Sequence, residues 1–140
     1  MKLTDIQEQW LEALESGEYA QTQAALRRND SYCCLGVACD VSGLGEWGRR
    51  LGTDGTDGTD GTVGTPGPAA PTMFHADDGE VESYALPKAV RRHLRLIQDG
   101  VDYLVYMNDS DGWAFKEIAA RVRRDPRRFF TPPSLSLIHI

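Results

Sequence analysis

Three cysteines in one short stretch are the residues of this chain best suited to covalent chemistry. Cys33 and Cys34 are adjacent and Cys39 follows, all within the run Ser31–Asp40. A thiol at the amino terminus of a helix has a lowered pKa, because the helix dipole favours the thiolate. If Cys33 or Cys34 begins a helix, the sequence therefore offers the nucleophile of a cysteine hydrolase or transferase.

A cysteine nucleophile also needs a base and a group that orients the base. His75 or His93 can serve as the base, and Asn108 or Asp109 as the orienting group. This hypothesis requires a cysteine sulfur within hydrogen-bonding reach of one of the two histidines.

Two other interpretations of the cysteines compete with the nucleophile. Cysteine is among the residue types most often buried, so the simplest interpretation is that all three are core side chains. Zinc would need Cys33, Cys34 and Cys39 together with a histidine. Adjacent cysteines on a helix diverge by about 100°, and the chain has no Cys-x-x-Cys pair. We therefore predict no metal site and no cofactor.

Placed on a helical wheel, the cysteine stretch is apolar on nearly every side, and only the stripe through Gly36 and Asp40 lacks bulk. A glycine inside a helix costs about 1 kcal/mol relative to alanine, so we expect Gly36 to admit another backbone or a ligand. Together with Asn108 and Asp109, these two residues form the predicted ligand-binding set. The polar run Met107–Gly112 can equally be a turn whose side chains cap backbone groups.

Amphipathic helices are expected to pack against this buried cysteine helix. Apolar residues at helical spacing predict the first over Asp5–Ser16, after a capping box of Thr4 and Gln7. The same spacing predicts the last over 115–124, ended by Asp125-Pro126.

The segments between these helices are shorter. Tyr19–Asp30 is compatible with a helix or an extended connection, and the glycines of Leu44–Trp47 indicate a loop. Asp78-Gly79 predicts a β-hairpin between 72–75 and 81–84. Pro87 opens a helix with Val90, Leu94 and Ile97 on one face and Gly100 beyond its end, and a further helix is expected over Val101–Met107.

Residues 52–71 repeat Thr-Asp-Gly three times and then become rich in proline. Such a composition cannot bury enough apolar area to form a core, so a disordered linker is predicted, inserted between 1–51 and 72–130 of a single domain. It lacks the spacing of a calcium-binding EF-hand loop. Within the tail 131–140, the end 135–140 reads like a translated sequencing adapter and is expected to be an artefact.

Composition limits the partners. The net charge of −6 argues against nucleic acid, and the arginines of 121–128 fit the solvated face of a helix. No apolar run approaches the roughly 20 residues that cross a bilayer, and no signal peptide is recognisable, so a cytoplasmic location without a membrane is expected. Another protein or a small molecule remains as partner, and the oligomeric state stays open.

Several motifs follow one another along the chain: Trp10-x-x-Ala13-Leu14, Tyr32-Cys33-Cys34-Leu35-Gly36-Val37-Ala38-Cys39, Leu86-Pro87, Asn108-Asp109-Ser110 and Phe115-x-Glu117-Ile118-Ala119. As an ordered set, they resemble a family of small, uncharacterised phage and prophage proteins. The resemblance implies a compact, mainly helical domain in a bacterial host cell, with no known catalytic residues. The linker and Ala114, where the family has Ser or Thr, depart from the pattern.

The sequence thus predicts a mainly α (α+β) domain, a small helical bundle around a cysteine-rich helix with a short β-hairpin. The expected function is that of a phage accessory protein that binds a host protein or small ligand without chemistry. A cysteine-dependent enzyme is one alternative. A sponge for host nucleotide signals is another, with Arg91, Arg92, Arg95 and Tyr84 as candidate pocket residues.

Overall fold

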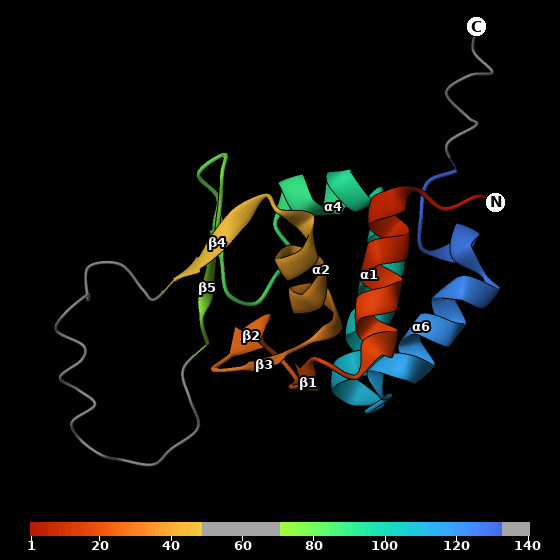
Figure 1. The fold of residues 1–140 in the computed structure, drawn as a ribbon, viewed down its shortest axis with the longest axis horizontal. Coiled ribbons are helices and arrows are strands. Elements are labelled where there is room, and N and C mark those ends of the chain that lie inside the picture. The colour runs from red at the N-terminus through yellow and green to blue at the C-terminus, as the bar shows by residue number, and fades with distance from the viewer. Residues whose placement is uncertain (49–70, 133–140) are drawn as a thin grey trace, which may run out of the picture.

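The computed structural model describes residues 1–48 and 71–132 of the chain. The predicted linker, except Pro71, and the predicted artefact 135–140 lie outside the described residues. The described part is an α+β fold, as predicted, with helices and two small three-stranded sheets. In Figure 1, α6, α1, α2 and the sheet of β4 and β5 follow one another across the molecule, with α4 at one end and β1–β3 at the other.

Helix α1 spans Asp5–Ser16, which confirms the prediction. Its capping box forms: Thr4 Oγ1 accepts from the backbone N–H of Gln7 at 3.3 Å, and the Gln7 side chain accepts from the N–H of Thr4 at 2.8 Å. Trp10 is fully buried and donates from its indole nitrogen to the carbonyl oxygen of Cys34 at 3.0 Å. This bond ties α1 to the cysteine helix.

Helix α2 spans Cys34–Ser42, with Cys33 as its N-cap, and is buried on most sides. A Cβ at Gly36 would lie 1.8 Å from the carbonyl oxygen of Leu26. The predicted close approach at Gly36 is thus confirmed, and a protein backbone makes it. Helices α1, α4 and α5 contact α2.

Residues 19–30 contain short strands, which settles the segment that the sequence left open. Strand β1 (Ala20–Gln21) pairs in parallel with β3 (Ser31–Tyr32), and β2 (Arg27–Arg28) pairs with β3 in antiparallel fashion. Ala24 and Asn29 have φ angles of 63° and 52°, in the left-handed region that turns use.

The second sheet contains the predicted hairpin, formed by β5 (Met73–Ala76) and β6 (Val81–Glu82). The predicted loop at Leu44–Trp47 is wrong, because Gly45–Gly48 forms β4 and pairs antiparallel with β5. Its glycines serve close packing: a Cβ at Gly45 would lie 2.3 Å from a backbone oxygen of β5. Phe74 and Ala76 of β5 alternate inward into the core.

Helix α4 spans Lys88–Leu94, and Pro87 is its N-cap rather than its first residue. The prediction that this helix continues to Ile97 is wrong. Arg95 adopts a left-handed φ of 60° and ends it, so that Ile97 becomes the N-cap of the next helix.

That next helix, α5, spans Gln98–Val105 and continues as a π-helix, η1, over Tyr106–Ser110. The prediction of a helix over Val101–Met107 is confirmed. Gly100 lies beyond the end of α4, as predicted, but inside α5 rather than between two helices. A Cβ at Gly100 would lie 2.7 Å from the Cα of Phe129. The glycine thus allows the C-terminal segment to cross α5 closely.

Helix α6 spans Phe115–Arg124, as predicted, and a short 3₁₀ helix, η2, follows at Pro126–Arg128. The N-cap of α6, Ala114, has no capping side chain, but the Glu117 carboxylate accepts from the Ala114 N–H at 2.9 Å. The chain then buries Phe129 and Phe130 completely.

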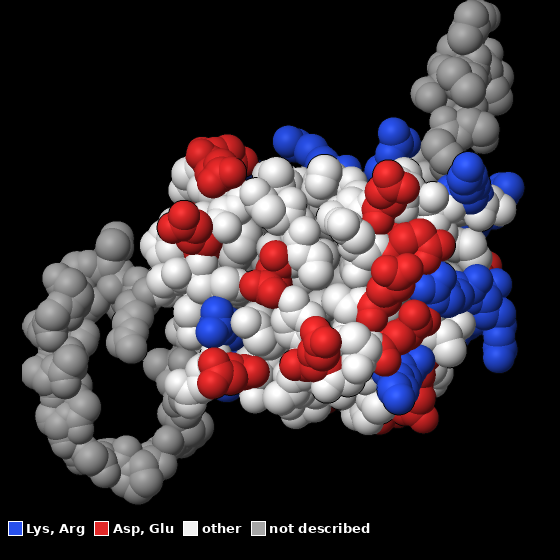
Figure 2. Space-filling model, in the orientation of Figure 1, with Lys and Arg blue, Asp and Glu red and all other residues white. Residues whose placement is uncertain are grey.

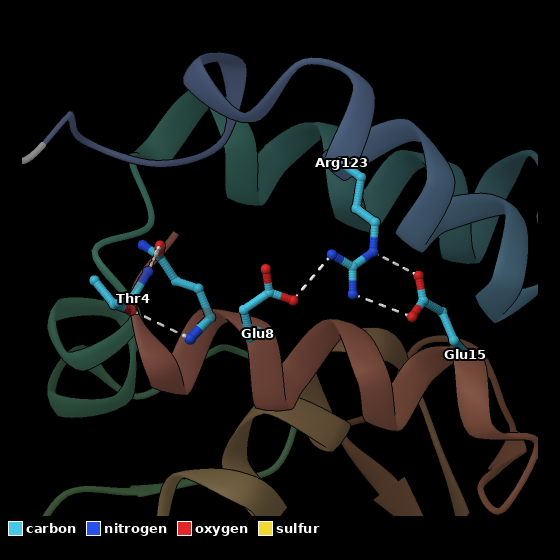
Figure 3. A network of polar contacts seen from close by, with 5 residues as sticks. Thr4, Glu8, Glu15 and Arg123 are labelled. Atoms are coloured by element: carbon cyan, nitrogen blue, oxygen red, sulfur yellow. Dashed lines mark hydrogen bonds and ion pairs between the residues drawn. The ribbon is translucent and has the colours of Figure 1, made fainter. Parts of the chain in front are cut away.

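The main packing partner of α6 is α1, not the cysteine helix as predicted, since α2 is short and already covered by α1, α4 and α5. Arg123 of α6 donates to Glu15 at 2.6 and 3.1 Å and to Glu8 at 2.9 Å (Figure 3). Figure 2 shows the acidic side chains gathered along α1 and basic side chains over α6. Within residues 1–48 and 71–132, no helix has the length and apolarity to cross a membrane.

Candidate functional site

The cysteine thiols are buried and held in the protonated form. Cys33, Cys34 and Cys39 are 7%, 0% and 1% exposed. Burial raises the pKa of Cys33 to about 11, although its sulfur accepts from the N–H of Gly36 at 3.4 Å. Burial also raises the pKa of Cys34 and Cys39 well above the ordinary value. The expectation of a thiol pKa lowered by the helix dipole is wrong, because loss of hydration outweighs the terminal N–H groups.

The two candidate bases, His75 and His93, lie on β5 and α4 and not on the cysteine helix. His75 sits on β5, in register with Glu46 and Val81, and His93 is exposed on α4. The Cys34 sulfur donates instead to the carbonyl oxygen of Leu104, at 3.8 Å. No hydrogen bond joins a histidine to a cysteine in the described part of the chain, so the geometry required of a cysteine nucleophile is not observed there.

Metal binding finds no support in the same residues. Across the described ranges, no group of three or more His, Cys, Asp or Glu side chains is arranged to hold an ion.

Asn108 is brought next to Cys34, but to the backbone of that residue and not to its sulfur. Its Oδ1 accepts from the N–H of Cys34 at 3.3 Å and from Nε2 of Gln21 at 2.8 Å. Its Nδ2 donates to the carbonyl oxygen of Thr22 at 2.9 Å and to Asp109 at 2.8 Å. Asn108 is 1% exposed, and this network caps the amino terminus of α2.

Asp109 belongs to the same network. Its Oδ1 also accepts from the N–H of Ala24 at 2.9 Å, which holds the turn after β1. The π-helix turns Met107 and Asn108, two consecutive residues, into the interior. The polar run therefore performs the capping that was its simpler interpretation.

Asp40 is the exposed member of the predicted ligand-binding set. Among the described residues, it shares no hydrogen-bond partner with Asn108. Its carboxylate accepts from the hydroxyl of Tyr19 and from the indole nitrogen of Trp47, the latter at 3.1 Å. Tyr32 packs edge-on between these two rings, with centroids 4.9 and 5.8 Å away. Arg27 lies over Tyr32 and Trp47, at 5.0 and 5.4 Å. Arg27, a cation of the same chain, thus already covers these rings. Through Asp40, the cluster joins the two sheets to α2.

A different aromatic group reaches the surface beside α5 and α6. The ring of Tyr103 stacks on Phe129, with centroids 5.7 Å apart, and on Tyr106, at 6.5 Å. Arg121 and Arg128 place their guanidinium carbons 5.6 and 5.2 Å from the Tyr103 centroid. We call the four residues Tyr103, Tyr106, Arg121 and Arg128 the Tyr103 surface.

This surface borders a hollow of about 620 Å³ lined by Ile97, Asp99, Asp102, Tyr103 and Arg128. Tyr106 is 52% exposed. Tyrosine and arginine are the residue types most enriched where proteins bind one another.

The residues suggested for a nucleotide pocket do not form this surface. Arg91 donates to the carbonyl oxygen of Leu96 at 3.2 Å. The other three are exposed: Tyr84 before α4, Arg92 on it and Arg95 directly after it. Sequence reasoning missed Tyr103 and Tyr106 as surface residues. Their spacing with Asp99 and Asp102, along one helical face, was the available signal.

These features define an α+β domain with sequestered thiols and an exposed surface of tyrosine and arginine. A family model described as a domain of unknown function (DUF8296) matches residues 1–125, and the chain belongs to that family. No curated protein matches the chain, and no solved structure matches it.

Proposed function

We propose that this chain is a non-enzymatic binding protein, an accessory protein of a phage or prophage that engages a protein of its host. The phage setting rests on the motif resemblance. The absence of chemistry is supported by the protonation and burial of the thiols and by the use of Asn108 and Asp109 as caps. We place the binding event at the Tyr103 surface.

One observation carries the proposal: an exposed tyrosine, Tyr106, continues a stack of rings that is anchored in the core at Phe129. A ring held in this way loses little conformational entropy when a partner covers it. The exposed part of the Tyr106 ring provides a preformed contact for a partner.

Native mass spectrometry of the protein, purified from bacterial cells that express it, tests this function. We expect a bound host protein with the wild-type chain and its loss with Tyr106→Ala. Tyr84→Ala is the matched control, because Tyr84 is also an exposed tyrosine, at 60%. A Cys33→Ser variant should retain the partner. Loss of the partner with Cys33→Ser but not with Tyr106→Ala, or a bare chain in every preparation, would contradict the proposal.

A further inference from the structure

The charges around Tyr103 specify what kind of segment the Tyr103 surface can bind. Arg121 and Arg128 both lie over its ring, and neither has a carboxylate within 4.0 Å among the described residues. Arg123, on the same helix as Arg121, provides the contrast, because Glu8 and Glu15 of α1 hold it in place. The stacking on Tyr103 leaves the N–H groups at the guanidinium edges of Arg121 and Arg128 available to an external acceptor.

The platform beneath these arginines is anchored in the core. Phe129, on which Tyr103 stacks at an interplanar angle of 14°, is fully buried. Its carbonyl oxygen accepts from the N–H of Ile97 at 2.9 Å, which fixes the rings to the start of α5. A partner therefore meets arginines whose positions are already defined, and the entropic cost of binding is reduced.

Two carboxylates on the rim exclude some anions. Asp99 and Asp102 line the same hollow as Arg128, and Asp102 is bonded to Gln98 at 2.9 Å. A chain of phosphates would be repelled by them, whereas a single carboxylate can approach the arginine side. The hollow of about 620 Å³ is also larger than one carboxylate fills, and Ile97 and Tyr103 give it an apolar wall.

We propose that the Tyr103 surface binds an acidic protein segment, in which an Asp or Glu stands next to an aromatic or aliphatic residue. The carboxylate pairs with Arg121 and Arg128, and the apolar neighbour packs against Tyr103 and Tyr106. This inference rests on the proposed function, because it names the chemistry of the partner at the same surface.

Selection from a library of random peptides displayed on phage particles tests this specificity with the full chain as bait. Peptides that pair Asp or Glu with a neighbouring aromatic or aliphatic residue are expected to be enriched. A selected peptide should bind the Arg121→Gln/Arg128→Gln variant about tenfold more weakly. Arg124→Gln is the matched control, since Arg124 is exposed on the same helix, and it should retain the affinity. Unfolding midpoints equal to that of the wild type show that the variants fold.

The outcomes separate this inference from the proposed function. Peptides that need Tyr106 but lack an acidic residue, or that ignore the two Arg→Gln changes, overturn the acidic specificity and leave the binding function standing. The absence of any enriched peptide overturns the specificity as well, while the native mass spectra decide the function independently. Nuclear magnetic resonance can follow the Tyr103 and Tyr106 ring signals while ATP or GTP is added. Saturable shifts of these signals would show that the surface binds a nucleotide, and this result would also overturn the acidic specificity.

Discussion

The side-chain oxygen Oδ1 of Asn108 accepts the backbone N–H of Cys34 at 3.3 Å, from a residue 74 positions away in the sequence. The first free N–H of the cysteine helix is thus satisfied by a side chain of the π-helix. This bond, and the bonds of Asn108 to Gln21 and Thr22, join the two halves of the domain on either side of residues 49–70.

Replacement of Asn108 is therefore expected to destabilise the whole domain. Asn108→Ala should lower the free energy of unfolding by about 3 kcal/mol, because buried donors and acceptors lose their partners. Urea denaturation measures this change. Ser110→Ala, an exposed change in the same π-helix, should have little effect, and equal losses from the two variants would show that Asn108 has no special role.

Gly36→Ala should destabilise the protein, although alanine is ordinarily the better helix former by about 1 kcal/mol. The added methyl would lie 1.8 Å from the Leu26 carbonyl oxygen, so α2 must move away from the segment that precedes β2. Thermal unfolding followed by circular dichroism reports the effect. A rise in melting temperature for Gly36→Ala would contradict this packing.

Ala114→Ser should stabilise the protein by about 1 kcal/mol. Ala114 already has the extended N-cap conformation, with φ −71° and ψ 157°, and Glu117 supplies half of a capping box. A serine hydroxyl would complete the box. Ala120→Ser, an exposed position inside the same helix, is the matched control and should be neutral or slightly destabilising in urea titrations.

Stability should fall as the pH rises from about 9 to about 11, because burial raises the pKa of Cys33 from 9.0 to about 11. Over this interval the unfolded thiol loses its proton while the folded thiol keeps it, so deprotonation favours unfolding. Burial also raises the pKa of Cys34 and Cys39, in the same direction.

Urea midpoints measured across this pH range test the effect. Each thiol can contribute a slope of up to about 1.4 kcal/mol per pH unit. Cys33→Ser removes one titrating group and keeps a capping acceptor, so its slope should be shallower than that of the wild type. A flat wild-type profile would show that the thiols are accessible to water.

Arg123→Ala should cost less than about 1 kcal/mol, because all three members of its ion-pair network are about a third exposed or more. The loss should shrink at high salt, since exposed pairs are screened. Comparison with Arg124→Ala in low and high salt measures the contribution of the pairs to the packing of α6 on α1. A loss that is unchanged by salt would assign the effect to packing of the arginine side chain instead.

Local signals allowed the prediction of α1 and α6, because each segment has an apolar period and is followed by a stop. The helix α1 also begins with a capping box. Strand β4 was missed, since its glycines resemble a loop and its partner β5 follows residues 49–70. The break after α4 depends on the positive φ of Arg95, and an arginine in a sequence does not predict this conformation.

The candidate sites could likewise be predicted only where the signal was local. The position of Cys33 at a helix terminus was predictable, but the direction of its pKa shift depends on burial by distant elements. The aromatic partners of Asp40 come from β4 and the segment before β1, so no spacing near Asp40 indicates them. Composition could not show which of the many arginines would lie over Tyr103.

The residues that follow the family match are part of the packed structure. The family match ends at Asp125, yet Phe129 and Phe130 are fully buried, and the backbone of 129–131 bonds to Arg95 and Ile97. The packed core of this chain therefore extends beyond the residues that the family model matches. A fragment trimmed to those residues would leave Tyr103 without the ring beneath it and Gly100 facing an empty groove.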